Sequence, residues 1–274
     1  MFPHLFTLGG ITIQTYGLLM AIGFILCYSL ATYLAKRTGR DPNEVQTIIM
    51  VAAIGGILGA RAVYVWQNWA TEFASDPMAM FMIWRGGLVF YGGFLLAAAA
   101  MLTYAKLKKE PLCSLTDFCA IFIPLGHAFG RLGCFFFGCC YGYIAPNAWY
   151  GVAFPQGSPA WHNQVIHQQI SPYAPKALPV CPTQLIEAIG CFLLFALLWW
   201  CYAKFRHLRG LCSAVYCTGY AGLRFLIECF RDDPRGDTYF GLSFSQMISV
   251  ALLVAGIALF TFALKGKTNG TVHR

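Results

Sequence analysis

Gly126–Gly142 reads GHAFGRLGCFFFGCCYG and closes a long apolar run. It carries His127 and Arg131, although a charged side chain at the centre of a membrane helix costs roughly 2.5–3.5 kcal/mol on insertion scales. That cost requires a partner on another helix or an anionic ligand. The two side chains are four residues apart, so they share one face of a helix. The sequence therefore predicts a positively charged helix face that holds a phosphate. Glycines along this stretch let a ligand or another backbone approach closely; they are Gly126, Gly130, Gly133, Gly138 and Gly142.

The composition is that of an integral membrane protein. Of the 274 residues, 58% are hydrophobic and 11% are charged, whereas soluble domains carry about 25% charged residues. The net charge of +8 comes from short basic clusters between apolar runs, which argues against nucleic-acid binding. No positively charged segment precedes the first apolar run, so we expect no signal peptide. The length fits a single polytopic domain over residues 1–274.

Seven apolar runs are long enough to cross a bilayer as helices, for which about 20 residues are needed. They predict an all-α fold with seven transmembrane helices. The runs are Tyr16–Ala35, Gln46–Trp66, Gly87–Ala105, Leu115–Phe137, Thr183–Ala203, Leu211–Phe230 and Phe240–Leu264.

The basic residues alternate between the two sides of these runs. Three follow each of the first, third, fifth and seventh runs, which places twelve of the nineteen Lys and Arg residues on one side. The other side holds four, namely Arg85, Lys176, Arg231 and Arg235. The positive-inside rule then places the N-terminus outside and the C-terminus in the cytoplasm.

Two segments stand out on the predicted outer side. In the first, Gln67–Gly86, the portion Met78–Trp84 is expected to lie in the membrane interface. The second, Tyr143–Val180, is long, polar and rich in proline. It predicts a small extracytoplasmic head over residues 143–180, because it has aromatic residues that can pack together: Trp149, Tyr150, Trp161 and Tyr173.

Arginines also occur in two other apolar runs. Arg61 follows Gly55 and Gly59, which form a small-xxx-small face for close helix contact. Arg61 either snorkels to an interface or binds a ligand. Arg224 precedes Glu228 by four residues, so a structural ion pair is the simplest interpretation. An arginine held by a glutamate can still present donors to a phosphate, because its guanidinium has five N–H groups.

Polar residues open two more runs. Pro182 and Thr183 mark a helix start, and Gln184 and Glu187 follow on one face. They either form a buried hydrogen bond or take part in a functional site. Tyr91 precedes Gly92 and Gly93, and is either an interfacial tyrosine or a phenol that bonds substrate or transfers a proton.

The twelve cysteines are irregularly spaced and include no CxxC pair, so we predict neither a zinc site nor a thioredoxin-like motif. Four lie near the outer ends of the fourth and fifth runs. Packing is the first interpretation, followed by a disulfide and then catalysis. These four are Cys134, Cys139, Cys140 and Cys181.

These pieces together resemble the prolipoprotein diacylglyceryl transferase family of bacterial inner-membrane enzymes. Gly130–Gly142 is similar to that family's GRxGNFxNGExxG signature, and Tyr16–Met20 resembles its first-helix start. Gly59–Arg61 and Tyr91–Gly93 match its G-x-R and HGG positions. Pro182–Glu187 resembles its P-S/T-Q-L-Y-E motif. A late GY…R…E…FR segment is matched by Gly219, Tyr220, Arg224, Glu228 and Arg231.

The resemblance implies transfer of a diacylglyceryl group from phosphatidylglycerol to the lipobox cysteine in a prolipoprotein signal peptide, with release of glycerol phosphate. It implies no cofactor and no metal. We expect Arg131 and Arg224 to bind the departing phosphate, where charge develops. Arg61 binds the same headgroup or supports a helix. The other expected substrate-binding residues are Tyr16, Gly92, Gly93, Gly130, Gly133, Gly142, Gln184, Glu187, Tyr220, Glu228 and Arg231.

The chain departs from the family at positions that carry chemistry. Cys134 and Phe137 stand where the signature has asparagines, and Cys139 where it has glutamate. Tyr91 stands at the position of a histidine proposed as a base. Because a phenol has a pKa of about 10, His127 is the alternative base, and the adjacent Arg131 favours its neutral, proton-accepting form.

Because the attacking thiol belongs to the prolipoprotein, we expect the chain's own cysteines to be dispensable for the chemistry. Three other functions compete with this interpretation: an anion transporter, a membrane thiol oxidoreductase and a non-catalytic lipid-binding relative. A transporter more often shows an internal repeat, and an oxidoreductase usually shows CxxC.

Overall fold

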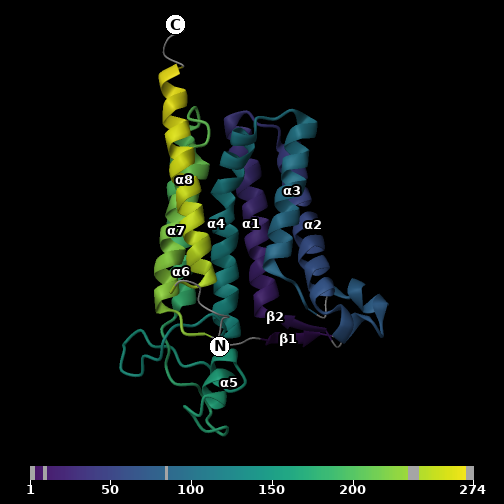
Figure 1. Cartoon of the computed structure of the whole chain (residues 1–274), viewed down its shortest axis with the longest axis vertical. Helices are drawn as coiled ribbons and strands as arrows, with labels where there is room; N and C mark the ends of the chain where they lie inside the picture. The colour runs from purple at the N-terminus through teal and green to yellow at the C-terminus, as the bar shows by residue number, and fades with distance from the viewer. Residues whose placement is uncertain (1–3, 9–10, 84–85, 234–240, 270–274) are drawn as a thin grey trace. The chain divides into compact units, whose positions relative to one another are not determined.

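The computed structural model describes residues 4–8, 11–83, 86–233 and 241–269. Seven helices of at least 19 residues make up most of this part of the chain (Figure 1). They are α1 (Thr15–Thr38), α2 (Pro42–Gln67), α3 (Phe90–Lys108), α4 (Leu112–Phe137), α6 (Thr183–Phe205), α7 (Leu211–Phe230) and α8 (Phe244–Asn269). The shorter elements are β1 (His4–Leu8), β2 (Ile11–Gln14), the π-helix η1 (Trp69–Phe73), the 3-10 helix η2 (Pro77–Phe81) and α5 (Pro159–Ile166).

Five of these helices are long and apolar enough to cross a membrane: α1, α2, α4, α6 and the Phe244–Lys265 part of α8. Helices α3 and α7 occupy the other two predicted runs, and their passage through the membrane stays a prediction. The chain is thus a mainly helical membrane protein, as its composition predicts.

The helix ends follow local capping rather than apolarity alone. Helix α7 has the predicted bounds. Helix α2 begins four residues before the predicted Gln46, because the side chain of Asp41 caps it by accepting a hydrogen bond from the Asn43 backbone N–H at 2.9 Å. The seventh predicted run begins at Phe240, which lies outside the described residues. So do Trp84, Arg85 and Arg235, which the sequence places on the outer side.

The N-terminal hairpin was missed by the search for apolar runs. Strands β1 and β2 pair antiparallel, with Thr7 opposite Thr12. The sequence does contain a hairpin signal, because Gly9 and Gly10 separate two short apolar segments, the second of which alternates between apolar and polar residues.

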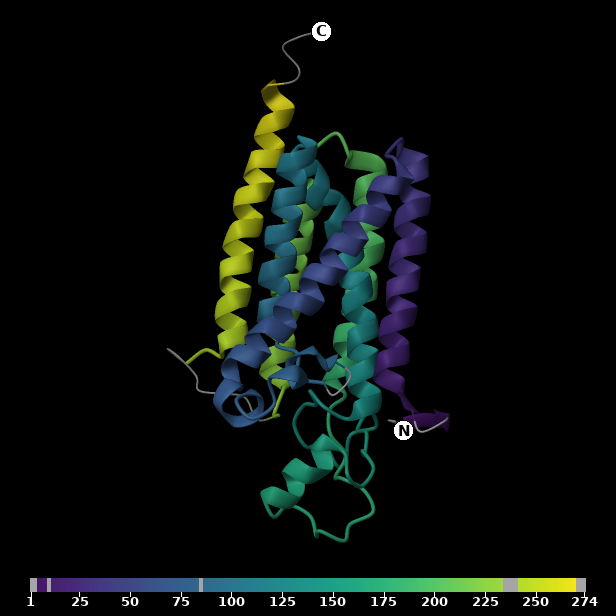
Figure 2. The ribbon, with the colours of Figure 1, turned by 90° about the vertical axis from the view of Figure 1, so that its right-hand side faces the viewer.

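The chain divides into two compact units. The first comprises residues 1–27 and 116–274, and the second residues 28–115. In the first unit, α7 packs against both α6 and α8 (Figure 2). Helix α4 packs on α6 through aromatic pairs such as Phe129–Phe192, whose ring centroids are 5.8 Å apart. Asp117 of α4 is buried and accepts hydrogen bonds from the Gly210 and Ser213 backbone N–H groups, at 2.6 and 2.8 Å.

In the second unit, α2 and α3 cross closely at glycines. A Cβ on Gly55 would lie 3.2 Å from the Cα atom of Ala97. A Cβ on Gly59 would overlap the backbone of Gly92, and one on Gly92 would overlap Gly59. The predicted small-residue face on α2 is therefore confirmed, and Gly92 and Gly93 form its counterpart on α3.

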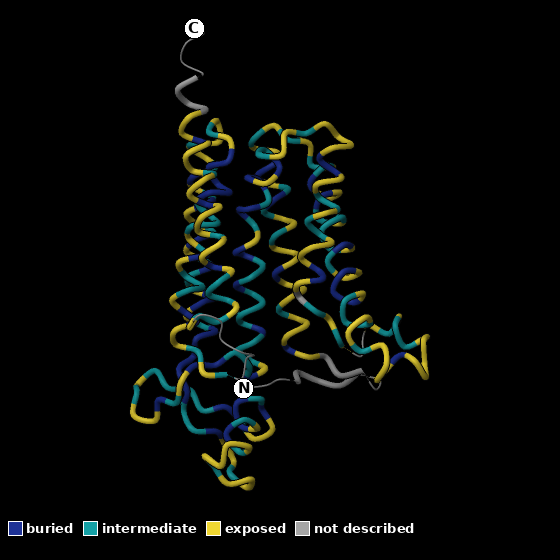
Figure 3. Tube along the Cα trace, in the orientation of Figure 1, coloured by how far each residue is buried: buried dark blue, intermediate teal, exposed yellow. Residues whose placement is uncertain are grey.

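The segment between α4 and α6 has its own apolar core, and Figure 3 shows buried stretches within it. Tyr141, Phe154, Trp161 and Val180 form its centre. Burial, with Asp233 nearby, raises the pKa of Tyr141 to about 12. The segment therefore has a core of its own, and its assignment as an extracytoplasmic head stays a prediction.

Only part of the predicted aromatic packing is present in this head. Trp161 is buried, whereas Trp149 and Tyr173 are 95% and 91% exposed and lie outside the core. The Trp149 ring does pack edge-on against Tyr150, with centroids 5.7 Å apart.

Candidate functional site

A buried carboxylate organises the polar residues of the first unit. Glu187, in the second turn of α6, is 1% exposed. Its Oε2 lies 3.0 Å from Arg131 Nε of α4 and 3.7 Å from Arg224 Nη1 of α7. Three helices therefore meet at one ion-pair cluster, which compensates the cost of arginine inside an apolar helix.

The ion pairs of the cluster leave the two arginines with further capacity to donate hydrogen bonds. The Arg131 contacts with Glu187 and His127 both involve Nε. Arg224 Nη1 is buried and has no hydrogen-bond partner among the described residues. A buried donor without an acceptor is costly, so an anionic oxygen brought by a ligand would be stabilised there.

His127 lies against the same cluster. Its Nε2 accepts a hydrogen bond from Arg131 Nε at 3.3 Å and lies 3.7 Å from Glu187 Oε1. The Tyr220 hydroxyl is 3.5 Å from the same nitrogen and donates to Glu187 Oε1 at 3.4 Å. The structure thus brings together four of the expected site residues: His127, Arg131, Glu187 and Tyr220.

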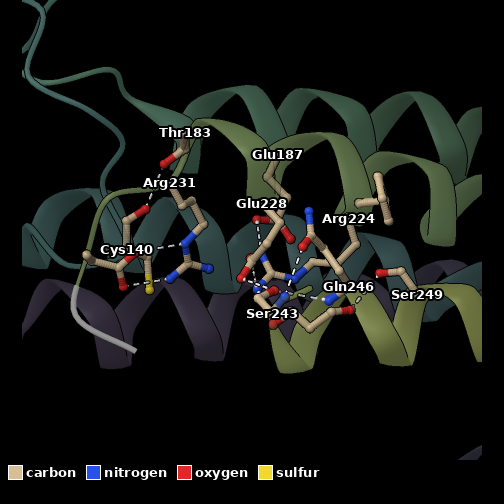
Figure 4. Close-up of polar contacts among 12 residues, drawn as sticks. Cys140, Thr183, Glu187, Arg224, Glu228, Arg231, Ser243, Gln246 and Ser249 are labelled. Carbon is tan, nitrogen blue, oxygen red and sulfur yellow. Dashed lines mark hydrogen bonds and ion pairs between the residues drawn. The ribbon is translucent and has the colours of Figure 1, made fainter. Parts of the chain in front are cut away.

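Glu228 extends the cluster toward α8, as Figure 4 shows. The predicted pair is confirmed, since Glu228 Oε2 lies 2.8 Å from Arg224 Nη2. Two serines missed by the sequence reasoning complete the contacts: Arg224 Nη2 donates to Ser245 Oγ at 2.9 Å, and Ser243 Oγ donates to Glu228 Oε1 at 2.8 Å.

A capping-box signal in the sequence could have identified the Ser243 region. The pattern Ser243-x-x-Gln246 is typical of a helix N-terminus. In the structure the Gln246 N–H donates to Ser243 Oγ at 3.2 Å, and the Ser243 N–H donates to Gln246 Oε1 at 3.0 Å. The cap fixes Ser243 where its hydroxyl reaches Glu228.

The end of α7 and the start of α6 meet the loop after α4. Arg231 forms a bidentate pair with Asp233, at 2.9 and 2.8 Å, and lies beside Cys140 (Figure 4). Gln184 Nε2 donates to the Cys139 carbonyl at 2.7 Å, while its Oε1 has no hydrogen-bond partner among the described residues. A Cβ on Gly142 would overlap the Phe230 carbonyl, so this position requires glycine.

Tyr16 and the glycines of α4 form a contact between two helices. The Tyr16 ring lies directly over Gly133, where a Cβ would be 2.6 Å from its Cδ2 atom. A Cβ on Gly130 would be 3.7 Å from Met20 Sδ, which leaves ordinary van der Waals space. Gly133 therefore permits the ring contact, and substrate contact at Tyr16, Gly130 and Gly133 stays a prediction.

Arg61, in the second unit, is 8% exposed and does not snorkel to water. Its guanidinium donates to five backbone carbonyls between Ala79 and Gly87, at 2.7–3.4 Å. Its charge also lies over the rings of Tyr64 and Phe73, at 5.5 and 5.4 Å from the centroids. This geometry favours the supporting role among those considered for Arg61.

Tyr91 lies in the first turn of α3, in the same unit, and is 46% exposed. Its neighbours Gly92 and Gly93 both pack against α2. The structure therefore gives the two glycines a packing role, and contact of Tyr91, Gly92 or Gly93 with substrate stays a prediction.

Known proteins match this chain along almost its whole length. The family model for prolipoprotein diacylglyceryl transferase matches residues 3–262. The chain belongs to this family. Proteins named phosphatidylglycerol–prolipoprotein diacylglyceryl transferase are 33% identical in Burkholderia thailandensis and 32% in Bordetella bronchiseptica, each over 96% of this chain and 95% of the relative. The protein of that name from Shigella boydii is 29% identical, over 96% and 93%.

In this member of the prolipoprotein diacylglyceryl transferase family, three of the four cysteines first interpreted as packing residues lie close together. The sulfur atoms of Cys134, Cys139 and Cys140 all lie within 4.8 Å of one another. Residue spacing does not predict this cluster, because a turn at Gly138 returns the backbone toward Cys134. Gly138 has a φ of +83° and Cys140 one of 61°, both in the left-handed region.

Proposed function

We propose that this chain transfers a diacylglyceryl group from phosphatidylglycerol to the lipobox cysteine thiol of prolipoproteins and releases glycerol phosphate. Membership of the family and the names of its relatives support this reaction. One structural observation carries the proposal: Arg131 and Arg224 converge on buried Glu187, and Arg224 Nη1, 3.7 Å from Glu187 Oε2, has no hydrogen-bond partner among the described residues.

In this reaction the lipobox thiolate attacks the glyceryl carbon of the lipid. The new C–S bond forms as the C–O bond to phosphate breaks, and the electron pair of that bond goes to the phosphate oxygen. Arg131 and Arg224 supply donors to the oxygens where negative charge grows. Glu187 holds both guanidinium groups before the lipid arrives, so little reorganisation is needed in the transition state.

The substrate's location also fits this placement of charge. Phosphatidylglycerol presents an anionic phosphate at the membrane surface, and the paired arginines lie within an apolar helical protein. The positive-inside pattern supports a bacterial inner-membrane orientation with the N-terminus outside and the C-terminus cytoplasmic. Reporter fusions test this: we expect cytoplasmic signals at Lys108 and Arg206 and an outside signal at Gln164, and an outside signal at Lys108 contradicts the orientation.

Complementation of a transferase-depleted bacterium tests the activity directly. We expect the chain to restore growth, and mass spectrometry of a model prolipoprotein to show one diacylglyceryl group on the lipobox cysteine. A substrate with serine in place of that cysteine provides the control and should stay unmodified. Stable, membrane-inserted protein that modifies neither substrate would instead indicate a non-catalytic lipid-binding relative.

A further inference from the structure

Three thiols outside the arginine cluster meet in a geometry that suits a metal ion. Their Sγ atoms, from Cys134, Cys139 and Cys140, lie within 4.8 Å of one another. Tetrahedral zinc with Zn–S bonds of about 2.3 Å separates its sulfur ligands by roughly 3.8 Å. The three sulfurs therefore need to approach by only about 1 Å or less to bind one Zn²⁺ ion.

The backbone that carries these thiols is firmly positioned. The Gly138 and Cys139 N–H groups donate to the Cys134 carbonyl at 2.9 and 3.2 Å, which closes the turn. From the start of α6, Thr183 Oγ1 donates to the Cys140 carbonyl and Gln184 Nε2 to the Cys139 carbonyl, each at 2.7 Å. Such outer hydrogen bonds hold ligands in place for a metal.

Two arginines place positive charge beside the three cysteines. Arg231 lies beside Cys140 (Figure 4), and Arg131 is within electrostatic range of Cys134 and Cys140. Three thiolates and one Zn²⁺ ion carry a net charge of −1, and the guanidinium groups of these two arginines lie near it while each also pairs with a carboxylate. Zinc suits the set, since it takes cysteine ligands and has no geometric preference from its d-electrons.

We propose that Cys134, Cys139 and Cys140 bind a Zn²⁺ ion whose fourth coordination position receives the thiol of the prolipoprotein. This inference rests on the proposed diacylglyceryl transfer, and it explains how the attacking prolipoprotein thiol is activated. Catalytic zinc sites keep three protein ligands and one open position, and zinc deprotonates a coordinating thiol outright. The expectation that every cysteine is dispensable is thereby replaced for these three.

The step balances with the groups already named. The prolipoprotein thiol loses its proton to water when it coordinates zinc. Its sulfur then attacks the glyceryl carbon, the C–S bond forms, and the C–O bond breaks with its electron pair going to phosphate. Arg131, three residues before Cys134 and on the same helix face, connects the metal site to the phosphate site.

The test measures metal and activity separately on the full-length protein, purified under reducing conditions in lipid nanodiscs. Wild type should retain about one zinc ion per chain, and cobalt in its place should show thiolate-to-metal charge-transfer absorption. Cys139→Ser should lose at least about nine-tenths of the zinc and the transfer activity, whereas Cys139→His, which keeps a ligand atom, should retain zinc and measurable transfer. Cys229→Ser, an exposed cysteine outside the trio, is the matched control and should match wild type.

Chelation followed by zinc addition completes the experiment. Loss and recovery of transfer support the proposal. Wild-type protein that is active without metal, cobalt-loaded protein without thiolate absorption, or a disulfide within the trio would overturn it and leave the proposed function standing. If zinc is bound by the trio but the loaded protein transfers nothing, the proposed function fails while the metal site stands.

Discussion

Arg131 of α4 and Glu187 of α6 form an ion pair inside the helical protein, with Nε 3.0 Å from Oε2. Their side chains are only 12% and 1% exposed, so neither charge is solvated by bulk water. A buried pair of this kind is costly to assemble and more costly to break on one side. The pair therefore connects stability to function, since the same guanidinium is proposed to bind phosphate.

Glu187→Gln should lower both the stability of the protein and its rate of diacylglyceryl transfer. The amide keeps the size of the side chain but leaves Arg131 and Arg224 without their shared counter-charge. Removing one partner of a buried ion pair costs about 3–5 kcal/mol. Thermal unfolding in detergent measures the effect, with Glu72→Gln in η1 as a matched control that should change stability little. Equal melting temperatures for the two variants would show that Glu187 is not the organising counter-ion.

Arg131→Lys tests whether the shape of the cation matters. Lysine keeps the charge but loses the planar fork that donates to Glu187 and a phosphate together. We expect the variant to insert into the membrane and accumulate normally. The transfer rate should fall roughly 10- to 100-fold, because a hydrogen bond to a charged group contributes about 1.5–3 kcal/mol. Near-normal turnover of phosphatidylglycerol in this variant argues against phosphate binding by Arg131.

Arg61→Lys should loosen the segment between η2 and α3. An ammonium group cannot reach the five carbonyls that the guanidinium now engages between Ala79 and Gly87. We expect faster proteolysis within this segment and a lower melting temperature, with the KM for lipid little changed. A large rise in KM with unchanged proteolysis would instead assign Arg61 to the headgroup.

The sequence predicts the positions of the long helices well, because polar loops separate the apolar runs, and α7 has the predicted bounds. It also predicts the Arg224–Glu228 pair, because residues four apart on a helix must be neighbours. It does not predict that Glu187 forms ion pairs with both Arg131 and Arg224, since these contacts depend on how α4, α6 and α7 pack. The thiol trio was missed for a related reason: a left-handed turn at Gly138 and Cys140 is not visible in residue spacing.

Trp149 and Tyr173 show the limit of such predictions. Aromatic character predicts burial on average, but the outcome depends on whether enough apolar surface lies nearby. Phe154, Trp161 and Val180 fill the head's core, which leaves these two rings exposed. Composition therefore predicts that a core exists more reliably than it predicts which rings join it.

The last prediction concerns proton removal from the substrate thiol. The sequence offers His127 and Tyr91 as bases, but His127 Nε2 already accepts a hydrogen bond from Arg131 at 3.3 Å. This contact favours a positioning role for His127, with the thiolate formed on the metal site instead. His127→Gln, which keeps an acceptor near the Nε2 position, should retain most activity and the wild-type lower limb of the pH–rate profile. His127→Ala should lose roughly 2- to 10-fold, as expected for one hydrogen bond of about 0.5–1.5 kcal/mol.

A general base would give a different pattern, because its removal typically costs roughly 10²–10⁴-fold. If the transfer rates of both His127→Gln and His127→Ala fall that far and the lower limb of the pH–rate profile shifts, His127 is the base. Tyr91→Phe provides the parallel comparison and should weaken transfer only through a lost hydrogen bond. An inactive Tyr91→Phe variant, with His127→Gln fully active, would assign proton removal to Tyr91. The pH–rate profiles of these variants therefore separate a side-chain base from activation by coordinated metal.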